Sequence, residues 1–295
     1  MAVDPNQMAT SIGNAPESNP LGKFFRTPGI YLRLPSGGNF WPAGSIDFPE
    51  TGEIPVYSMT ARDEILLNNP DALMNGQAVV DVIQSCCPSI RDAWSMPGID
   101  LDAVLIAIRI ASYGESMDFN SACPACTEEN SYSSDLRPLL DKVTTNSKYA
   151  EEQPHLGLTF KFKPQPYRVI NMLNLETFET NRMFSVINNA ELEDQEKMDR
   201  VNAIFKKMTD YTVGVVSGGI QEIITPDGQE VTRQDHIDEF VKNCDRTTFK
   251  WIQDTLSEIG NASALSELDI ECPNCGNKYS TPMTFDQANF FGSGS

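Results

Sequence analysis

Short segments with a two-residue apolar period indicate several strands. Leu158–Lys163 alternates apolar and polar residues, as a half-buried strand does. Strand-like segments also lie at Gly29–Pro35 and Glu53–Met59, and Pro55 limits the second of these to an edge or terminal position. Thr225–Val231 indicates a turn between two more short strands. We therefore expect short antiparallel strands at widely separated places in the chain.

Apolar residues at helical spacing predict three helices in the first part of the chain. The first opens at Thr60, where Asp63 stands in position to complete a capping box. A second is expected over 71–86. Asp100 is expected to cap a third, which ends at Gly114.

Longer helices are predicted in the second half of the chain, at about 167–187, 192–217 and 233–259. The last of these has two parts and carries apolar residues at core-like spacing. Helices then outweigh strands, so the expected fold class is α+β, mainly helical with short antiparallel strands.

Composition and motifs divide the chain into four expected parts. Residues 1–24 are rich in Pro, Asn, Ser and Gly and predict a flexible N-terminal arm. An α+β domain is expected over 25–134 and a helical insertion over 135–267. Residues 268–295 are expected to form a second cysteine knuckle and a C-terminal tail.

Two Cys-x-x-Cys pairs are the most informative motif. Cys123 and Cys126 form the first pair, Cys272 and Cys275 form the second, and residues 127–271 lie between them. Four thiolates are the ligand set of a tetrahedral structural Zn²⁺ site with no open position for chemistry. We expect one Zn²⁺ per chain, held by these side chains in a zinc-ribbon-like module. Closing a loop of this length is worth about 5 kcal/mol in the chain-entropy treatment of cross-links.

Each pair is expected at a tight turn between strands. Proline follows the first cysteine of both pairs, and Gly276 frees the backbone to turn after the second pair. Thr127 takes the place of that glycine in the first pair, which is the weak point of the motif. The flanking strands are expected at 115–120, 129–133, 269–271 and 279–284.

Other roles for these cysteines fit the sequence less well. The polar start of the chain does not have the form of a signal peptide, and seven cysteines cannot all pair in disulfides. Acidic residues after Cys126 would raise a thiol pKa, which does not favour a thioredoxin-like redox site. His155 and His236 are poor candidates as metal ligands. Cys86, Cys87 and Cys244 are expected to be buried free thiols.

Composition argues against three classes of protein: nucleic-acid-binding proteins, membrane-spanning proteins and enzymes. The net charge is −19, which opposes nucleic-acid binding because that affinity comes largely from Lys and Arg on phosphates. No apolar run reaches the length of a membrane helix. With two histidines and no phosphate-binding loop, a catalytic constellation is not evident, and we expect that the protein is not an enzyme.

A set of motifs in order carries a family resemblance. They are YLRLPSGGNFWP at 31–42, IPVYSMTARDE at 54–64, NNP at 68–70, AIRIASYG at 107–114 and CPAC at 123–126. This order resembles the T4-like bacteriophage baseplate hub family of contractile-tailed phages, over about residues 25–140.

The resemblance implies a structural or assembly protein at the centre of a phage baseplate, where tail tube, sheath and tape-measure ends meet. It implies other hub, tube, wedge or tape-measure proteins as partners, several copies in one assembly, and a place in the virion after assembly in the host cytoplasm. Leu34–Gly38 is then either a docking loop or an ordinary turn, and its Pro and Gly favour the turn.

Two other functions stay open at this point. The chain could be a baseplate assembly factor or tail chaperone that leaves the finished particle. It could also be a cytosolic zinc-ribbon adaptor without a viral role.

Overall fold

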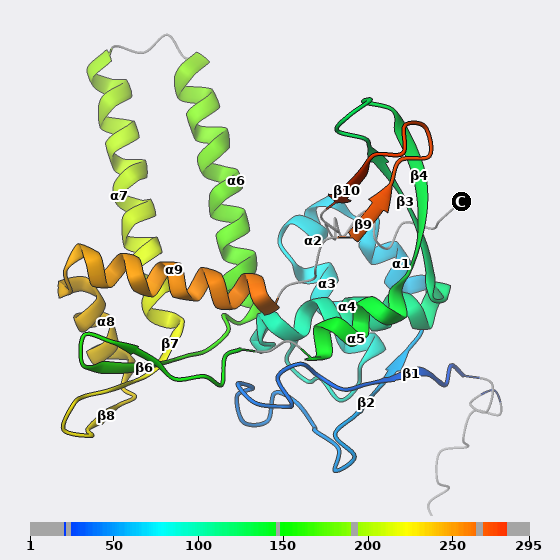
Figure 1. Cartoon of the computed structure of the whole chain (residues 1–295), viewed down its shortest axis with the longest axis horizontal. Helices are drawn as coiled ribbons and strands as arrows, with labels where there is room; N and C mark the ends of the chain where they lie inside the picture. The colour runs from blue at the N-terminus through cyan, green and yellow to red at the C-terminus, as the bar shows by residue number, and fades with distance from the viewer. Residues whose placement is uncertain (1–20, 22–24, 146–147, 190–193, 264–267, 282–295) are drawn as a thin grey trace, which may run out of the picture.

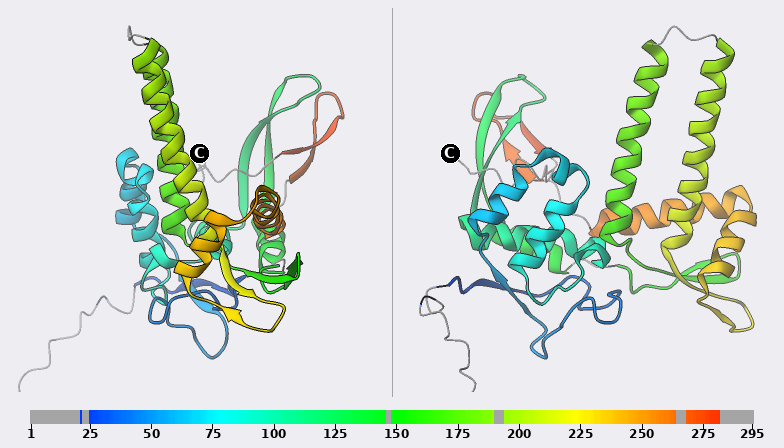
Figure 2. Two further views of the ribbon diagram at one scale, coloured as in Figure 1. Left: turned by 90° about the vertical axis from the view of Figure 1, so that its left-hand side faces the viewer. Right: turned by 180° about the vertical axis from the view of Figure 1, so that it is seen from behind.

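The computed structural model describes residues 21, 25–145, 148–189, 194–263 and 268–281. The expected flexible arm lies almost wholly outside the described residues, as does the tail after residue 281. The described residues form two apolar cores, a projecting pair of helices and two β-hairpins that lie side by side (Figures 1 and 2).

The first core is built around one buried helix. β1 (Pro28–Leu32) and β2 (Ile54–Tyr57) pair antiparallel, and both pack on α4 (Gly98–Tyr113). Nearly every residue of α4 from Ile99 to Ile110 is buried, because strands cover one side and helices the other. The predicted strands and this helix are confirmed.

Three short helices extend the first core. The capping box of α1 (Ala61–Leu67) is present, since Thr60 and Asp63 bond each other's backbone amides. The prediction of one helix over 71–86 was wrong. The chain forms α2 (Pro70–Met74) and α3 (Gln77–Cys86), separated at Gly76, where φ is +78°. Helix α3 packs on α4, and α1 and α2 pack on α3.

Asp100 does not cap α4, contrary to the prediction. Pro97 occupies the cap position, and Asp100 lies buried in the first turn. Its carboxylate accepts bonds from the Ser36 backbone N–H (2.8 Å), the Ser36 hydroxyl (2.6 Å) and Trp41 Nε1 (2.8 Å). The buried acid therefore fixes the 34–41 turn on the first core.

The second core lies between a small sheet and three helices. The sheet has the order β5-β6-β7-β8 and is antiparallel throughout. Phe160 and Phe162 point from the sheet into the core, and Ile237 and Ile252 meet them from the helices. The strands are β5 (Gln153–His155), β6 (Leu158–Phe162), β7 (Ile220–Ile224) and β8 (Glu230–Val231). The helices are the inner end of α7 (Asp194–Gly218), α8 (Gln234–Asn243) and α9 (Arg246–Ser263).

The helices α6 (Tyr167–Asn189) and α7 (Asp194–Gly218) project together from the body, and we name this pair the helical arm (Figures 1 and 2). Its base is fixed to the first core. The Gly98 backbone N–H donates to the Gln165 carbonyl (2.8 Å), and the Tyr167 N–H donates to the Met96 carbonyl (2.8 Å). The Tyr167 ring also stacks on the ring of Trp94, which lies in the 3₁₀ turn Ala93–Ser95.

The predicted helices of the second half are therefore confirmed, including the two parts of the last one. One more helix, α5 (Leu136–Thr145), starts the range expected as the helical insertion. Its leucines Leu136, Leu139 and Leu140 pack in the first core rather than the second. None of the described helices has the length and apolar character needed to cross a bilayer.

Candidate metal centre

Two β-hairpins hold the Cys-x-x-Cys pairs at their tips. β3 (Ser116–Ala122) and β4 (Glu129–Asp135) pair over seven residues each, and β9 (Leu268–Glu271) and β10 (Lys278–Thr281) over four. The predicted flanking strands are thus confirmed, except that residues 282–284 of the last one lie outside the described residues. A long segment of the chain separates the two hairpins in sequence, but the second hairpin lies beside the first in space (Figure 1).

The two knuckles repeat the same backbone hydrogen bonds. The Thr127 N–H donates to the Cys123 carbonyl, and the Gly276 N–H donates to the Cys272 carbonyl, both at 2.8 Å. The N–H of each first cysteine donates across its turn at 2.9 Å, to the carbonyl of Glu128 or Asn277. The turns are therefore equivalent although only one contains glycine.

Thr127 and Gly276 both adopt the left-handed conformation, with φ of +61° and +71°. This conformation costs a residue with a Cβ about 1–2 kcal/mol. The Thr127 hydroxyl bonds the Cys126 carbonyl at 2.7 Å, a local contact that accompanies the strained backbone. Threonine in place of glycine at position 127 therefore leaves the turn of the first knuckle unchanged in conformation.

The structure brings all four predicted cysteines together. Their sulfurs lie within 4.8 Å of one another. Cys123 Sγ lies 3.7 Å from Cys275 Sγ, and Cys126 Sγ lies 3.7 Å from Cys272 Sγ, so each short pair joins the two knuckles. Sulfurs at the corners of a tetrahedron with Zn–S near 2.3 Å are about 3.8 Å apart. The cluster fits a tetrahedral metal ion.

Amide groups surround the sulfurs and support negative charge on them. The side-chain Nδ2 of Asn130 lies 3.6 Å from Cys272 Sγ, and Nδ2 of Asn277 lies 3.9 Å from Cys123 Sγ. Each asparagine belongs to one hairpin and contacts a cysteine of the other. Hydrogen bonds of this kind stabilise thiolates and orient metal ligands.

The thiol pKa values also reflect the shared cluster. Burial raises the pKa of Cys123. Hydrogen bonds from the backbone N–H groups of Cys126 and Ala125, and from the Cys275 thiol, lower it to about 6. A hydrogen bond from the Asn277 backbone N–H lowers the pKa of Cys275. Hydrogen bonds with Cys126, desolvation, and hydrogen bonds with Cys272 and Cys123 raise it to about 12. Contacts within the cluster therefore shift the pKa of Cys123 and that of Cys275 in opposite directions, and a metal cation would displace the protons of its ligands.

Side chains beyond the cysteines also join the two hairpins. The Tyr279 hydroxyl lies 3.2 Å from the Tyr132 hydroxyl and 3.3 Å from the Ser121 hydroxyl. Ser121 also bonds Thr281 Oγ1 at 3.4 Å. These contacts could not be predicted from the sequence, because tyrosine and serine at alternate strand positions are common in any exposed hairpin.

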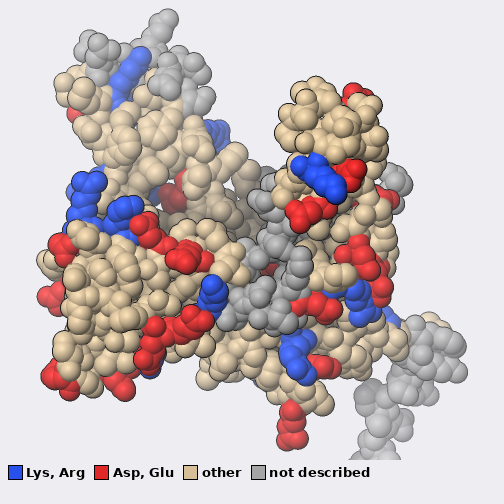
Figure 3. Space-filling view, in the orientation of Figure 1, with Lys and Arg blue, Asp and Glu red and all other residues tan. Residues whose placement is uncertain are grey.

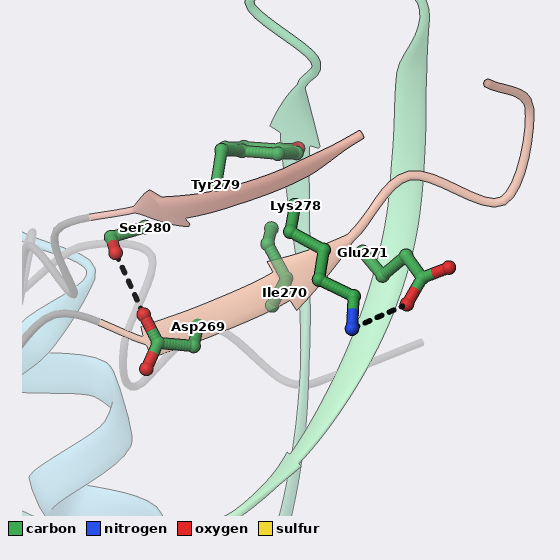
Figure 4. Close-up of a pocket in the computed structure, with 6 residues that line it drawn as sticks. All are labelled: Asp269, Ile270, Glu271, Lys278, Tyr279 and Ser280. Carbon is green, nitrogen blue, oxygen red and sulfur yellow. Dashed lines mark hydrogen bonds and ion pairs between the residues drawn. The ribbon is translucent and has the colours of Figure 1, made fainter. Parts of the chain in front are cut away.

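A shallow depression lies on the second hairpin, with a volume of about 450 Å³ (Figure 4). Asp269, Ile270, Glu271, Lys278, Tyr279 and Ser280 line it. Its polar groups bond each other, since Ser280 donates to Asp269 at 2.7 Å and Lys278 lies 3.7 Å from Glu271. No set of free polar groups converges there, so it is not a ligand site of the usual kind.

The remaining cysteines and the histidines lie elsewhere. Burial raises the pKa of Cys86 to about 12 and raises that of Cys87, which fits inert core thiols. Cys244 follows the last turn of α8 and is partly exposed, whereas the sequence predicts a buried thiol. His155 lies in β5 and stacks on Trp251, with ring centroids 4.1 Å apart.

The comparisons with known proteins identify a family. A family model described as T4 bacteriophage base plate protein matches residues 33–292. The match extends past the 25–140 range of the sequence motifs and includes the helical arm and the second knuckle. No curated protein and no solved structure matches the chain. Because the model covers most of the sequence, the chain belongs to the T4 bacteriophage base plate protein family.

Proposed function

We propose that the protein is a structural component of a contractile phage tail baseplate, at or near the central hub, and that it stays in the virion. The family match over residues 33–292 carries the baseplate role. The hub position is supported by the motifs at 31–42, 54–64 and 107–114, which resemble hub proteins in their order.

The proposed cofactor is one structural Zn²⁺ per chain. Cys123, Cys126, Cys272 and Cys275 would hold it, and when bound the ion would supply only a cross-link. Four sulfur ligands favour Zn²⁺ among the ions with closed tetrahedral sites, and they leave no position for a substrate. Asn130 and Asn277 would orient the thiolates from the opposite hairpin.

The proposed role does not require an enzyme activity. Two histidines in the whole sequence give few possible nucleophile and base pairs. The two lie apart along the chain, His155 in β5 and His236 in α8.

The proposed partners are other tail and baseplate proteins: hub, tube, wedge or tape-measure components. The net charge of −19 favours basic protein surfaces over nucleic acid. The bonds from Ser36 to Asp100 support an internal role for the Leu34–Gly38 turn, in preference to a docking loop.

Quantitative mass spectrometry of purified phage particles tests this proposal. The expected result is the chain in fixed ratio to known baseplate proteins in finished virions. Lysates of infected host cells at the time of assembly serve as the comparison. Presence in lysates and absence from particles would support an assembly factor or tail chaperone. Absence from both, with expression at other times, would support a cytosolic adaptor.

A further inference from the structure

The helical arm leaves much of its apolar surface exposed. In its projecting part, residues 170–212, only Ile187 is buried among the side chains that the structure describes. Six large apolar side chains there are between 44% and 60% exposed: Met172, Phe178, Met183, Met198, Phe205 and Met208. On the face that Figure 3 shows, fewer acidic side chains are visible on this projecting region than on the body below it.

The two helices bury little against each other. Phe184 and Phe205 meet with ring centroids 6.0 Å apart, and Lys207 pairs with Glu176 at 2.7 Å. A pair of helices has no third layer to cover its apolar residues, and stable folds bury such residues against another element. The arm as seen is therefore an incomplete bundle.

The exposed side chains follow helical periods. Met172 and Met183 are separated by about three turns of α6 and lie on one face of that helix. Met198 and Phe205 are separated by about two turns of α7 and lie on one face, with Met208 one turn farther on. Apolar stripes of this kind are what helices present to other helices in bundles.

The charge of the arm favours a copy of itself as the partner. The two helices carry six basic and six acidic residues, whereas the whole chain has a net charge of −19. The connection at 190–193 adds two glutamates. Two copies that approach through their bodies bring like charges together, but two arms bring a balanced mixture of both signs.

The exposed area is sufficient for a stable contact. Each of the six side chains offers about 100 Å² if half of its surface is exposed. Phe178 lies on another face of α6, so the two stripes hold five of these side chains. One arm then offers about 500 Å² of apolar area and two arms about 1,000 Å², which is near the lower limit for specific protein interfaces. We infer that the helical arm is a self-association surface, on which the arm of a second copy of this chain packs to complete a helical bundle.

The test compares two triple variants of the full-length protein. Met172→Glu, Met183→Glu and Met198→Glu together place three charges on the arm. Ile65→Glu, Met74→Glu and Leu156→Glu together form the control, because these exposed apolar residues lie off the arm. The added charge is the same in both. Circular dichroism and thermal melting verify that each variant is folded.

Sedimentation equilibrium between about 1 and 100 μM, at about 0.15 M salt, gives the readout. The wild type and the control are expected to exceed the 32.7 kDa monomer mass with rising concentration. The folded arm variant is expected to associate at least about tenfold more weakly. Amide exchange in 167–218 is expected to slow with concentration in the wild type. A wild type that stays at monomer mass, or an arm variant that associates as the wild type does, overturns the inference. Neither result depends on the virion experiment.

Discussion

Two residues with left-handed backbone set the shape of the metal knuckles. Thr127 and Gly276 have nearly the same φ, and each donates its N–H to the carbonyl of the first cysteine in its pair. Only Gly276 adopts this conformation without steric cost. The first knuckle therefore carries backbone strain that the second does not.

Gly276→Ala is expected to lower the free energy of unfolding by about 1 kcal/mol, because alanine gains the strain that glycine avoids. The added Cβ would meet nothing within 4 Å, so the variant measures the cost of the left-handed backbone without a steric clash. Urea unfolding of metal-loaded protein measures the change. Thr127→Gly is the matched variant, which relieves strain in the other knuckle and is expected to lose less than Gly276→Ala. Equal losses in both variants would contradict this account of the turns.

Asp100 is expected to make stability depend on pH. Burial raises its pKa from 3.8 to about 6, although the bonds from Ser36 and Trp41 lower it. The folded state then binds the proton more tightly than the unfolded state does. As the pH falls from about 6 to about 4, stability rises by up to about 3 kcal/mol from this group, and above pH 6 that gain is absent.

Urea midpoints of the wild type and Asp100→Asn between pH 4 and 7.5 measure this contribution. Their difference isolates Asp100 from the other titrating groups, including the thiols. Asp100→Asn is expected to be less stable throughout, since an amide cannot accept from all three donors. Parallel curves across the range would show that Asp100 does not titrate there.

At the scale of the elements, patterns with local causes could be predicted from the sequence. The capping box at Thr60, the alternation in Leu158–Phe162 and the apolar spacing of α6 and α7 all act within a few residues. The role of Asp100 could not be predicted, because it depends on tertiary contacts. The break at Gly76 follows a local Asn-Gly turn, which the apolar spacing over 71–86 does not reveal. The buried acid is explained by donors about sixty residues away in sequence.

The base of the helical arm offers a steric test at the same scale. A Cβ on Gly98 would lie 2.5 Å from Ile170 Cδ1 and 3.1 Å from the Gln165 carbonyl oxygen. Gly98→Ala is expected to destabilise the protein by about 1–3 kcal/mol through overpacking. Gly214→Ala is the control, because its Cβ meets nothing within 4 Å in α7, and it is expected to be neutral or stabilising by up to about 1 kcal/mol. Thermal and urea unfolding of both variants decide the matter; an equal effect would contradict close packing at the arm base.

At the scale of the whole molecule, the two hairpins close a segment that contains the second core and the arm. The contact between two distant cysteine pairs could be predicted, because two Cys-x-x-Cys pairs commonly hold one structural zinc ion. The tyrosine contacts between the hairpins could not, since no pattern in the sequence marks them. The four sulfurs are thus the predictable part of a larger contact between hairpins.

Cys272→Ser is expected to release the ends of this segment and to lower the free energy of unfolding by about 3–5 kcal/mol. Cys244→Ser is the control, because Cys244 is partly exposed and lies outside the cluster. Differential scanning calorimetry with and without a chelator measures both. The chelator is expected to destabilise the wild type and Cys244→Ser but not Cys272→Ser. A melting curve for Cys272→Ser equal to that of the wild type would count against a shared site.

Elemental analysis of protein purified without chelator, together with titration of free thiols, tests the metal centre most directly. One zinc per chain in the wild type and in Cys244→Ser, with less than about a tenth of that in Cys272→Ser, is the result that the four-sulfur geometry predicts. Metal-free wild-type protein that melts as a folded chain, with these four thiols free or oxidised, would contradict the claim that a single ion fastens the two hairpins.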